Sequence, residues 1–196
     1  EILGREYDSH YPILYSLITG KNSNVIQPRI LKTKESQGKR TKGKAEVFTP
    51  SWVCNAQNNL VDNAWFGSEN IFNREIEKGW ETNTEKIKFP DKKNKTWQKY
   101  VDEKRLEITC GEAPYLVSRY DTVSGEPLEL KDRIGMLDRK MRVVCENTDS
   151  DTEWLKWSER AFQSVYGFEF QGDSLLIARE NLLASYCDYM EEKLNR

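Results

Sequence analysis

The chain has 196 residues, of which 37% are hydrophobic and 32% are charged, and its formal net charge is −2. A chain of this length can build one domain with a modest core, and the absence of a long apolar run or a signal peptide argues against membrane insertion and secretion, so we expect a soluble cytoplasmic protein. Four cysteines without a CxxC pair and a single histidine argue against a zinc site or a disulfide framework.

The first 45 residues are predicted to form a helix followed by a basic loop. Apolar side chains spaced three or four apart predict a helix from Tyr11 to Ile18, which Gly20 would end. The stretch from Arg29 to Lys44 contains seven basic residues, one acidic residue and two glycines. We expect this loop to be disordered without DNA and to contact phosphates through Lys39, Arg40, Lys42 and Lys44, the alternative being a solvated surface loop.

A longer helix is predicted from Ser51 to about Asn63, because apolar side chains recur on one face. That face would hold Val53, Ala56, Leu60 and Val61. The segment from Trp65 to Pro90 mixes asparagine, glutamate and aromatic residues without a clear period. We therefore expect a long irregular excursion there.

The second half of the chain alternates expected strands and helices. In chain order these are a helix at Thr96–Val101, a strand at Arg105–Thr109, helices at Leu116–Tyr120, Glu129–Met141 and Trp154–Ser164, a strand at Val165–Phe170 and a helix at Leu175–Leu194. This alternation predicts an α/β fold. Gly111 and Glu169 are 58 positions apart, more than a single crossover helix needs, so we expect an insertion at about 121–151.

Three separated segments carry the pattern that points to a function. The run LEITCGEAPYL, from Leu106 to Leu116, has the composition of a buried strand that ends in an acid, a glycine and a small residue. Such a turn lets the backbone come close to a ligand beyond the strand end. The other two segments are EVFTPSWV, from Glu46 to Val53, and VYGFEF, from Val165 to Phe170.

Together and in this order, the three segments resemble motifs X, I and II of the gamma-class S-adenosylmethionine (SAM) dependent DNA methyltransferases, which act on adenine N6. In that family motif X has the form F-T-P, motif I the form D-P-x-C-G-x-G-x-F/Y-L, and motif II is an acid that closes the second strand. The chain is particularly similar to the large modification methylases labelled restriction endonuclease subunit M, in which E-x-x-C-G-E-A-P-Y-L replaces the commoner motif I.

The resemblance covers roughly Arg40 to the C-terminus. It implies a partial Rossmann-like class I SAM-dependent methyltransferase sheet, with N-terminal helices and an insertion between its first two strands. Residues 1–45 would be the N-terminal helix and basic loop, and 46–196 the N-terminal part of the SAM-binding domain. Double-stranded DNA would be a partner, within a restriction-modification system that can include a restriction or specificity component.

The cofactor implied by the resemblance is SAM. Glu169 would accept hydrogen bonds from the ribose hydroxyls, and Thr49 lies where backbone N–H groups at a helix start could hold the carboxylate of the amino-acid tail. The residues assigned to the cofactor are Phe48, Thr49, Glu107, Gly111, Ala113 and Glu169.

The chain also departs from the family pattern. Glu107 replaces the usual aspartate and Ile108 the usual proline, while Glu112 and Ala113 stand where small residues and a second glycine are common. The N/D-P-P-Y/F tetrapeptide that holds the target amine is absent, because no two prolines are adjacent. We therefore assign no catalytic residue and expect an N-terminal piece of a longer enzyme, inactive by itself.

Two other functions remain open from the sequence. The chain could be a non-catalytic module that binds nucleic acid and keeps a vestigial SAM fold. It could also belong to a SAM-dependent methyltransferase that acts on RNA or protein.

Overall fold

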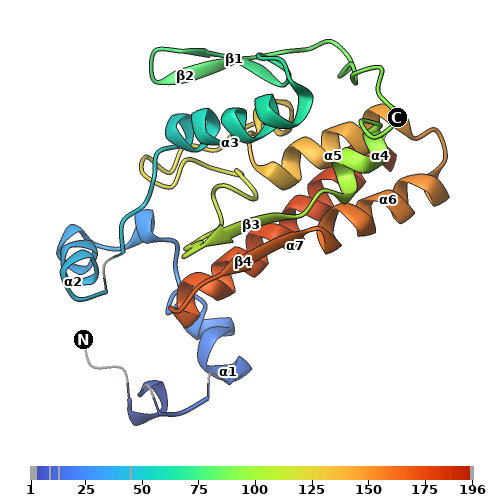
Figure 1. The fold of residues 1–196 in the computed structure, drawn as a ribbon. Helices are drawn as coiled ribbons and strands as arrows, with labels where there is room; N and C mark the ends of the chain where they lie inside the picture. The colour runs from blue at the N-terminus through green and yellow to red at the C-terminus, as the bar shows by residue number, and fades with distance from the viewer. Residues whose placement is uncertain (1–3, 9, 13, 45, 195–196) are drawn as a thin grey trace.

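The structure is a computed structural model that describes residues 4–8, 10–12, 14–44 and 46–194. These residues form a mixed α/β fold with two small sheets of two strands each (Figure 1). Within the described residues, no helix has the length and the apolar character needed to cross a membrane.

The N-terminal part consists of short helical elements, and one of them corrects the sequence prediction. The elements are η1 (Arg5–Tyr7), α1 (Tyr15–Ile18), η2 (Gly20–Asn22), η3 (Arg29–Leu31) and α2 (Lys34–Lys44). The helix expected at Tyr11–Ile18 is therefore shorter in the structure. Its expected range includes position 13, which lies outside the described residues. The expected disordered basic loop is wrong, because most of it is helix α2.

Helix α2 forms despite its two glycines because local contacts support it. Thr33 Oγ1 accepts a hydrogen bond from the Ser36 N–H group at 3.2 Å, which caps the start of the helix. Glu35 and Lys39 pair across one turn at 2.7 Å. Arg40 pairs with Glu46, and with Asp173 at 2.9 Å, so that the helix is anchored to the rest of the molecule.

The central part contains α3 (Ser51–Phe66), β1 (Asn73–Ile76), β2 (Gly79–Thr82), α4 (Trp97–Asp102) and β3 (Arg105–Ile108). The expectation of an irregular excursion at Trp65–Pro90 is wrong, because β1 and β2 form an antiparallel hairpin in which Ile76 pairs with Gly79. Lys78 takes a positive φ of 52° in the two-residue turn, a conformation that usually needs Gly or Asn. The sequence therefore lacked the usual signal for a hairpin.

The C-terminal part contains η4 (Leu130–Asp132), α5 (Met136–Asn147), α6 (Asp151–Gln163), β4 (Val165–Phe168) and α7 (Gly172–Leu194). β3 and β4 pair in parallel, with Arg105 opposite Val165 and Ile108 opposite Phe168. Helices α5 and α6 lie in the crossover between the two strands. Both strands, α6 and α7 agree with their predicted positions to within a few residues.

The prediction of a helix at Leu116–Tyr120 is wrong. The backbone carbonyl groups at the start of this segment are hydrogen-bonded to the start of α5 instead. The carbonyl oxygens of Tyr115 and Leu116 accept hydrogen bonds from the Met136 and Leu137 N–H groups, at 2.7 and 2.9 Å. These carbonyls therefore satisfy the free N–H groups at the start of α5. A Cβ atom on Gly135 would lie 2.3 Å from the Leu116 carbonyl oxygen, so the close approach requires glycine.

Helix α3 is buried on its polar face, which reverses the sequence prediction. Leu60 and Val61 are exposed, whereas the buried side chains include Asn55, Asn58, Asn59 and Asp62. The cause lies on α5, where Arg139 is almost fully buried and donates to the side chains of Asp62, Asn55 and Asn59 at 2.7–2.8 Å. A buried guanidinium needs polar partners, so it draws the polar face of α3 inward.

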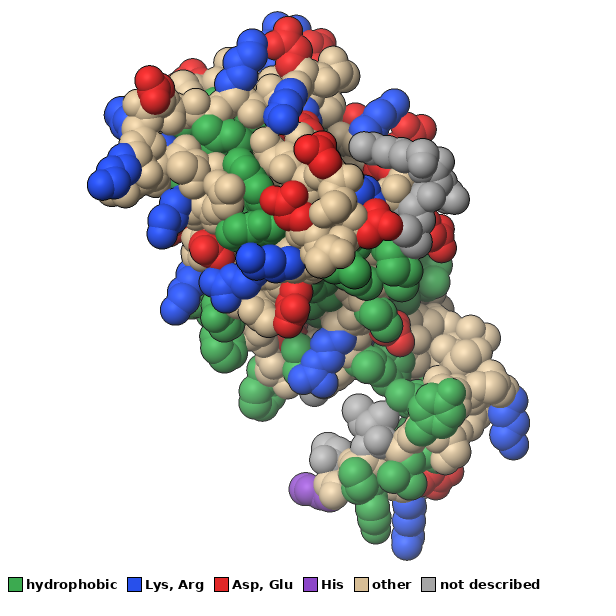
Figure 2. Space-filling view, turned by 90° about the vertical axis from the view of Figure 1, so that its right-hand side faces the viewer, with side chains coloured by type: hydrophobic (Ala, Val, Ile, Leu, Met, Phe, Trp, Pro, Cys, Tyr) green, Lys and Arg blue, Asp and Glu red, His purple; other side chains and the backbone are tan. Residues whose placement is uncertain are grey.

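The core is formed mainly by α4, α5, α6 and α7, around Tyr100, Met141 and Trp154. The β1–β2 hairpin packs against α3. Helices α1 and α2 lie on the side of the molecule to which the carboxyl ends of β3 and β4 point (Figure 1). On the face shown in Figure 2, basic and acidic side chains are intermingled, in keeping with the small net charge.

Candidate cofactor-binding site

Three segments that are distant in the sequence meet at the carboxyl ends of β3 and β4. Phe48, Thr49, Glu107, Gly111 and Glu169 line one cavity there, with a volume of about 300 Å³. The carboxyl ends of parallel strands meet at one edge of a sheet, which is the usual place for a ligand in open α/β folds. Five of the six residues that the sequence assigned to the cofactor are thus brought together.

The turn that follows β3 places the sixth residue elsewhere. Thr109, Gly111 and Ala113 all have positive φ angles, of 54°, 55° and 64°. Ala113 is buried and lines a neighbouring cavity of about 200 Å³ that also borders β4 and α7. Ala113 therefore belongs to the turn but does not line the cavity of the other five residues. Non-glycine residues in this conformation store strain, which is typical of ligand-binding turns.

Gly111 is the point where the segment from Glu46 to Val53 contacts the segment from Leu106 to Leu116. A Cβ atom at this position would lie 3.3 Å from Cε1 of the Phe48 ring, and φ is also positive. Both facts favour glycine, because other residues rarely adopt this backbone conformation and would crowd the ring. The backbone of the turn is therefore open toward the cavity, with Phe48 as its facing wall.

Glu169 lies just beyond β4 and points toward the turn. Its Oε2 accepts a hydrogen bond from the Gly111 N–H group at 2.7 Å, and its Oε1 accepts one from the Gln171 N–H group at 2.8 Å. Each carboxylate oxygen can accept more than one hydrogen bond. Glu169 therefore links the two strand ends and keeps acceptor capacity for a bound hydroxyl group.

Glu107, the third residue of β3, is buried beside the cavity with only 8% of its surface exposed. Burial raises the pKa of its carboxyl group to about 8, against the opposing effect of hydrogen bonds from the N–H groups of Tyr115 and Leu116. Its Oε2 has no hydrogen-bond partner among the described residues. At neutral pH the carboxyl group of Glu107 is therefore protonated, and its Oε2 atom, buried next to the cavity, makes no hydrogen bond to the described residues.

Phe48 and Thr49 are held by residues that the motifs do not include. The Arg29 guanidinium lies 5.4 Å from the centre of the Phe48 ring. The Thr49 carbonyl oxygen accepts a hydrogen bond from the Thr122 hydroxyl at 3.1 Å. At the start of α3, Asp121 Oδ2 accepts from the Ser51 N–H group at 2.6 Å. The helix start that was expected to hold a ligand carboxylate is thus partly satisfied by Asp121.

Glu112, in the turn after β3, has a structural role. It is almost completely buried, and its carboxylate accepts hydrogen bonds from the Arg29 N–H group and the Tyr120 hydroxyl, both at 2.6 Å. Burial raises the pKa of this carboxyl group, and the two hydrogen bonds oppose that effect. Glu112 therefore fastens the N-terminal segment to the turn, a long-range contact that no local sequence pattern could indicate.

The residues predicted to contact DNA differ in availability. Arg40 is engaged with Glu46 and Asp173, so its charge is already paired. Lys39 is exposed and pairs with Glu35 in the same helix, and Lys42 is exposed. The side chain of Lys44 lies outside the described side chains. Within α2, Lys39 and Lys42 are therefore the predicted residues that remain available to phosphates.

The turn after β3 also contains a cysteine. Cys110 lies in the turn, and burial raises the pKa of its thiol to about 12, which keeps it protonated. Among the described residues, no group of three or more His, Cys, Asp or Glu side chains could hold a metal ion.

The cavity thus combines a glycine turn, a carboxylate held by backbone N–H groups and a buried protonated acid. No family model, curated protein or solved structure matches this chain. A function is therefore inferred from the geometry of the cavity and from the motif pattern of its three segments.

Proposed function

We propose that this chain is the N-terminal, cofactor-binding part of a SAM-dependent DNA adenine-N6 methyltransferase of a restriction-modification system. The observation that carries the proposal is the convergence of the three motif-like segments on one cavity. Glu169 contacts the Gly111 N–H group, and the Phe48 ring packs against Gly111. A chance similarity of three short segments would give no reason for them to meet.

The residues around the cavity fit the chemistry of SAM. SAM carries a positively charged sulfonium, and the carboxylate of Glu169 lines the cavity, while Glu46 is paired with Arg40 and Glu107 is protonated. When bound, SAM supplies the methyl group for transfer. Glu169 would accept hydrogen bonds from the ribose hydroxyls, and Phe48 would form an apolar wall.

A Rossmann-like methyltransferase sheet would extend beyond β3 and β4. Among the described residues β3 pairs only with β4, so its other edge is unpaired. Leu106, Ile108, Tyr166 and Phe168 are exposed on these strands. Parallel sheets are normally covered on both faces. In this proposal the remaining strands of the sheet and the site for the target amine are formed by residues outside this chain and lie beside the unpaired edge of β3. Lys39 and Lys42 of α2 would contact the phosphate backbone of DNA.

The proposal is tested by calorimetric titration of the protein with SAM. Glu169→Ala removes the carboxylate and should weaken binding about tenfold or more, because a hydrogen bond to a charged group contributes on the order of 1.5–3 kcal/mol. Glu159→Ala is the matched control, since Glu159 is exposed on α6 and does not line the cavity. Absence of SAM binding, or equal affinity of Glu169→Ala and the parent, would refute the proposal.

A further inference from the structure

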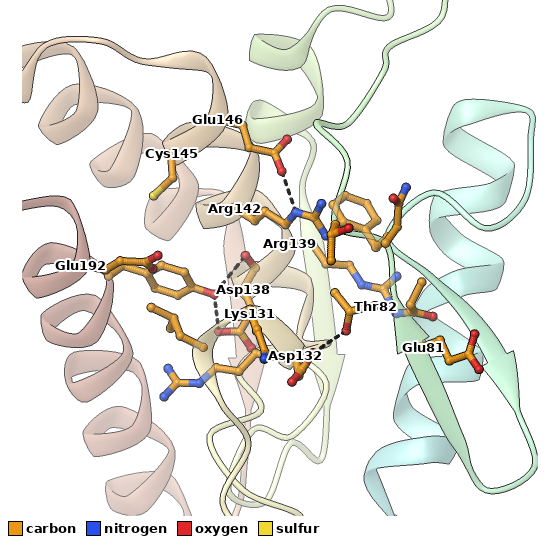
Figure 3. Close-up of a pocket in the computed structure, with 17 residues that line it drawn as sticks. Glu81, Thr82, Lys131, Asp132, Asp138, Arg139, Arg142, Cys145, Glu146 and Glu192 are labelled. Carbon is orange, nitrogen blue, oxygen red and sulfur yellow. Dashed lines mark hydrogen bonds and ion pairs between the residues drawn. The ribbon is translucent and has the colours of Figure 1, made fainter. Parts of the chain in front are cut away.

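Two cavities of the molecule differ in how their walls are held in place. Figure 3 shows a cavity of about 600 Å³ between the β1–β2 hairpin, the η4 segment, α5 and α7. Its walls include Phe72 and Tyr189, which belong to the hydrophobic core, so close packing fixes them. The cavity at the carboxyl ends of β3 and β4, the strand-end cavity, has instead one wall, from Glu46 to Thr49, that follows α2 in the chain.

Helix α2 owes its order to polar contacts. Its sequence, KESQGKRTKGK, contains two glycines and no hydrophobic residue, and none of its described side chains is buried. An isolated helix of 11 residues is marginal in water, because helix formation starts from a costly nucleus. The position of α2 therefore depends on the ion pairs and hydrogen bonds that connect it to the rest of the molecule.

These polar contacts converge on the strand-end cavity. Arg40 pairs with Glu46, which lines the cavity, and the Thr41 hydroxyl donates to the Glu46 carbonyl oxygen at 3.1 Å. Arg40 also pairs with Asp173 at 2.9 Å, and Lys32, which precedes α2, pairs with the same carboxylate at 3.2 Å. Asp173 lies at the start of α7, between two residues that line the cavity. The residues that hold α2 are therefore part of the cavity wall or directly next to it.

The ion pair between α2 and α7 is partly exposed to solvent. The accessible fraction is 20% for the side chain of Arg40 and 26% for that of Asp173. Ion pairs at such positions each contribute little, and salt weakens them. Segments held in this way open locally more easily than a packed core does. Helix α2 is thus suited to detach and return while the rest of the fold stays intact.

The contacts of α2 with Glu46 extend this opening to the cavity wall. We propose that α2 and the residues from Glu46 to Thr49 form a flap over the strand-end cavity, and that flap closure and ligand binding stabilise each other. In the closed position the Phe48 ring lies against Gly111. A ligand that contacts the closed wall shifts the flap toward that state. The inference rests on the proposed function for the identity of the ligand, SAM.

Hydrogen exchange of the full chain, measured by mass spectrometry without SAM, tests the flap itself. Asp173→Asn removes the charge that two basic side chains share, and it should speed exchange in α2 at least about threefold, with exchange in α6 unchanged. Asp188→Asn is the matched control, because Asp188 also lies on α7 and pairs with two arginines, with 29% of its side chain exposed, but neither arginine belongs to α2. Equal exchange in α2 for Asp173→Asn and the parent would overturn the inference.

A second pair of variants separates the flap from an effect of Asp173→Asn on α7. Arg40→Met leaves the sequence of α7 intact and removes the guanidinium that pairs with Glu46 and Asp173, so it should also speed exchange in α2. Arg119→Met removes a partner of Asp188 and should leave exchange in α2 unchanged. Unchanged exchange in Arg40→Met, or an equal increase in Arg119→Met, would overturn the inference.

Calorimetric titration with SAM tests the coupling. Saturating SAM should slow exchange in α2 of the parent, and Asp173→Asn should weaken SAM binding at least about threefold, whereas Asp188→Asn should bind SAM as the parent does. Equal SAM affinity of Asp173→Asn and the parent would overturn the coupling and leave the proposed function intact. Absence of SAM binding to the parent would instead refute the proposed function, and exchange in α2 without ligand would still decide whether the flap exists.

Discussion

The helical core and the cavity at the carboxyl ends of β3 and β4 differ in the contacts of their buried charged side chains and in the strain of their backbone. In the core, both terminal nitrogens of Arg139 are hydrogen-bonded, and Lys140 donates to the carbonyl oxygens of Val101 and Glu103 and to the Ser164 hydroxyl. At the cavity, Glu107 has an unpartnered oxygen, and the adjacent turn has three residues with positive φ. Nε of Arg139 also lacks a partner among the described residues, so the feature that distinguishes the cavity is the strained turn beside it rather than an unpartnered polar atom.

The largest expected effect is a loss of folding stability when the buried Arg139 of the core is replaced. Arg139→Met removes the partner of Asp62, at 2.7 Å, and of two buried asparagines. We expect a loss of about 3–5 kcal/mol in the free energy of unfolding, because the partner charge is left buried and unpaired. Urea denaturation measures this change.

The control for that prediction is Arg160→Met, whose ion pair with Asp102 is largely exposed. Its removal should change the free energy of unfolding by less than about 1 kcal/mol. Similar losses of stability for the two variants would show that the Arg139 cluster does not have the special role in the core that we assign to it.

The second prediction concerns Glu107 and pH. Its pKa in the folded state is about 8, above the ordinary 4.5. The folded protein therefore holds a proton that the unfolded chain releases, so this group lowers stability as the pH rises from 4.5 to about 8. A single group of this kind gives a slope of at most about 1.4 kcal/mol per pH unit.

Glu107→Gln tests this prediction, because the amide has a similar shape and does not titrate. Denaturation curves between pH 6 and pH 8 should show a shallower fall in stability for the variant than for the parent. An identical pH dependence would mean that Glu107 ionises normally and is not a protonated acid at the cavity.

The third prediction separates backbone strain from ligand contact at Gly111. Gly111→Ala should destabilise the protein by about 1–2 kcal/mol because of its positive φ, and should also weaken SAM binding. Gly67→Ala has a similar backbone penalty, with φ 77°, but no atom lies within 4 Å of the added Cβ. If Gly67→Ala weakened SAM binding as much as Gly111→Ala, the contact between Phe48 and Gly111 would have no specific role in binding.

The smallest expected effect concerns the basic helix. Changing Lys39 and Lys42 together to alanine should reduce the slope of log affinity against log salt for duplex DNA, by about 0.9 for each phosphate that α2 no longer neutralises. Lys131 and Lys156 changed together serve as the control, because both are exposed and lie outside α2. An unchanged slope in the Lys39 and Lys42 variant would exclude α2 from the DNA interface.

The elements that the sequence predicts well are those with a strong local pattern. Thr96 caps α4, which begins one residue after its expected start, and Ser150 caps α6, which begins three residues before its expected start at Trp154. The ends of β3 and β4 were expected near Thr109 and Phe170, close to where they lie. Local propensity and tertiary structure agree in these elements, and the motif pattern therefore located most of the cavity.

The parts that the sequence misses depend on long-range contacts. The polar face of α3 is buried because Arg139, far along the chain, requires its oxygens. α2 is ordered in part because Arg40 reaches Asp173, and Glu112 holds the backbone of Arg29. None of these contacts leaves a periodic signal in a single sequence, because each joins segments that are remote from each other.

The most direct test of the central claim is a crystal structure of the protein with sinefungin, a non-reactive analogue of SAM. The account predicts that the analogue occupies the cavity between Phe48 and Gly111, with its ribose hydroxyls hydrogen-bonded to the carboxylate of Glu169. An analogue bound elsewhere, or a Glu169 carboxylate that makes no contact with the ribose, would contradict the account.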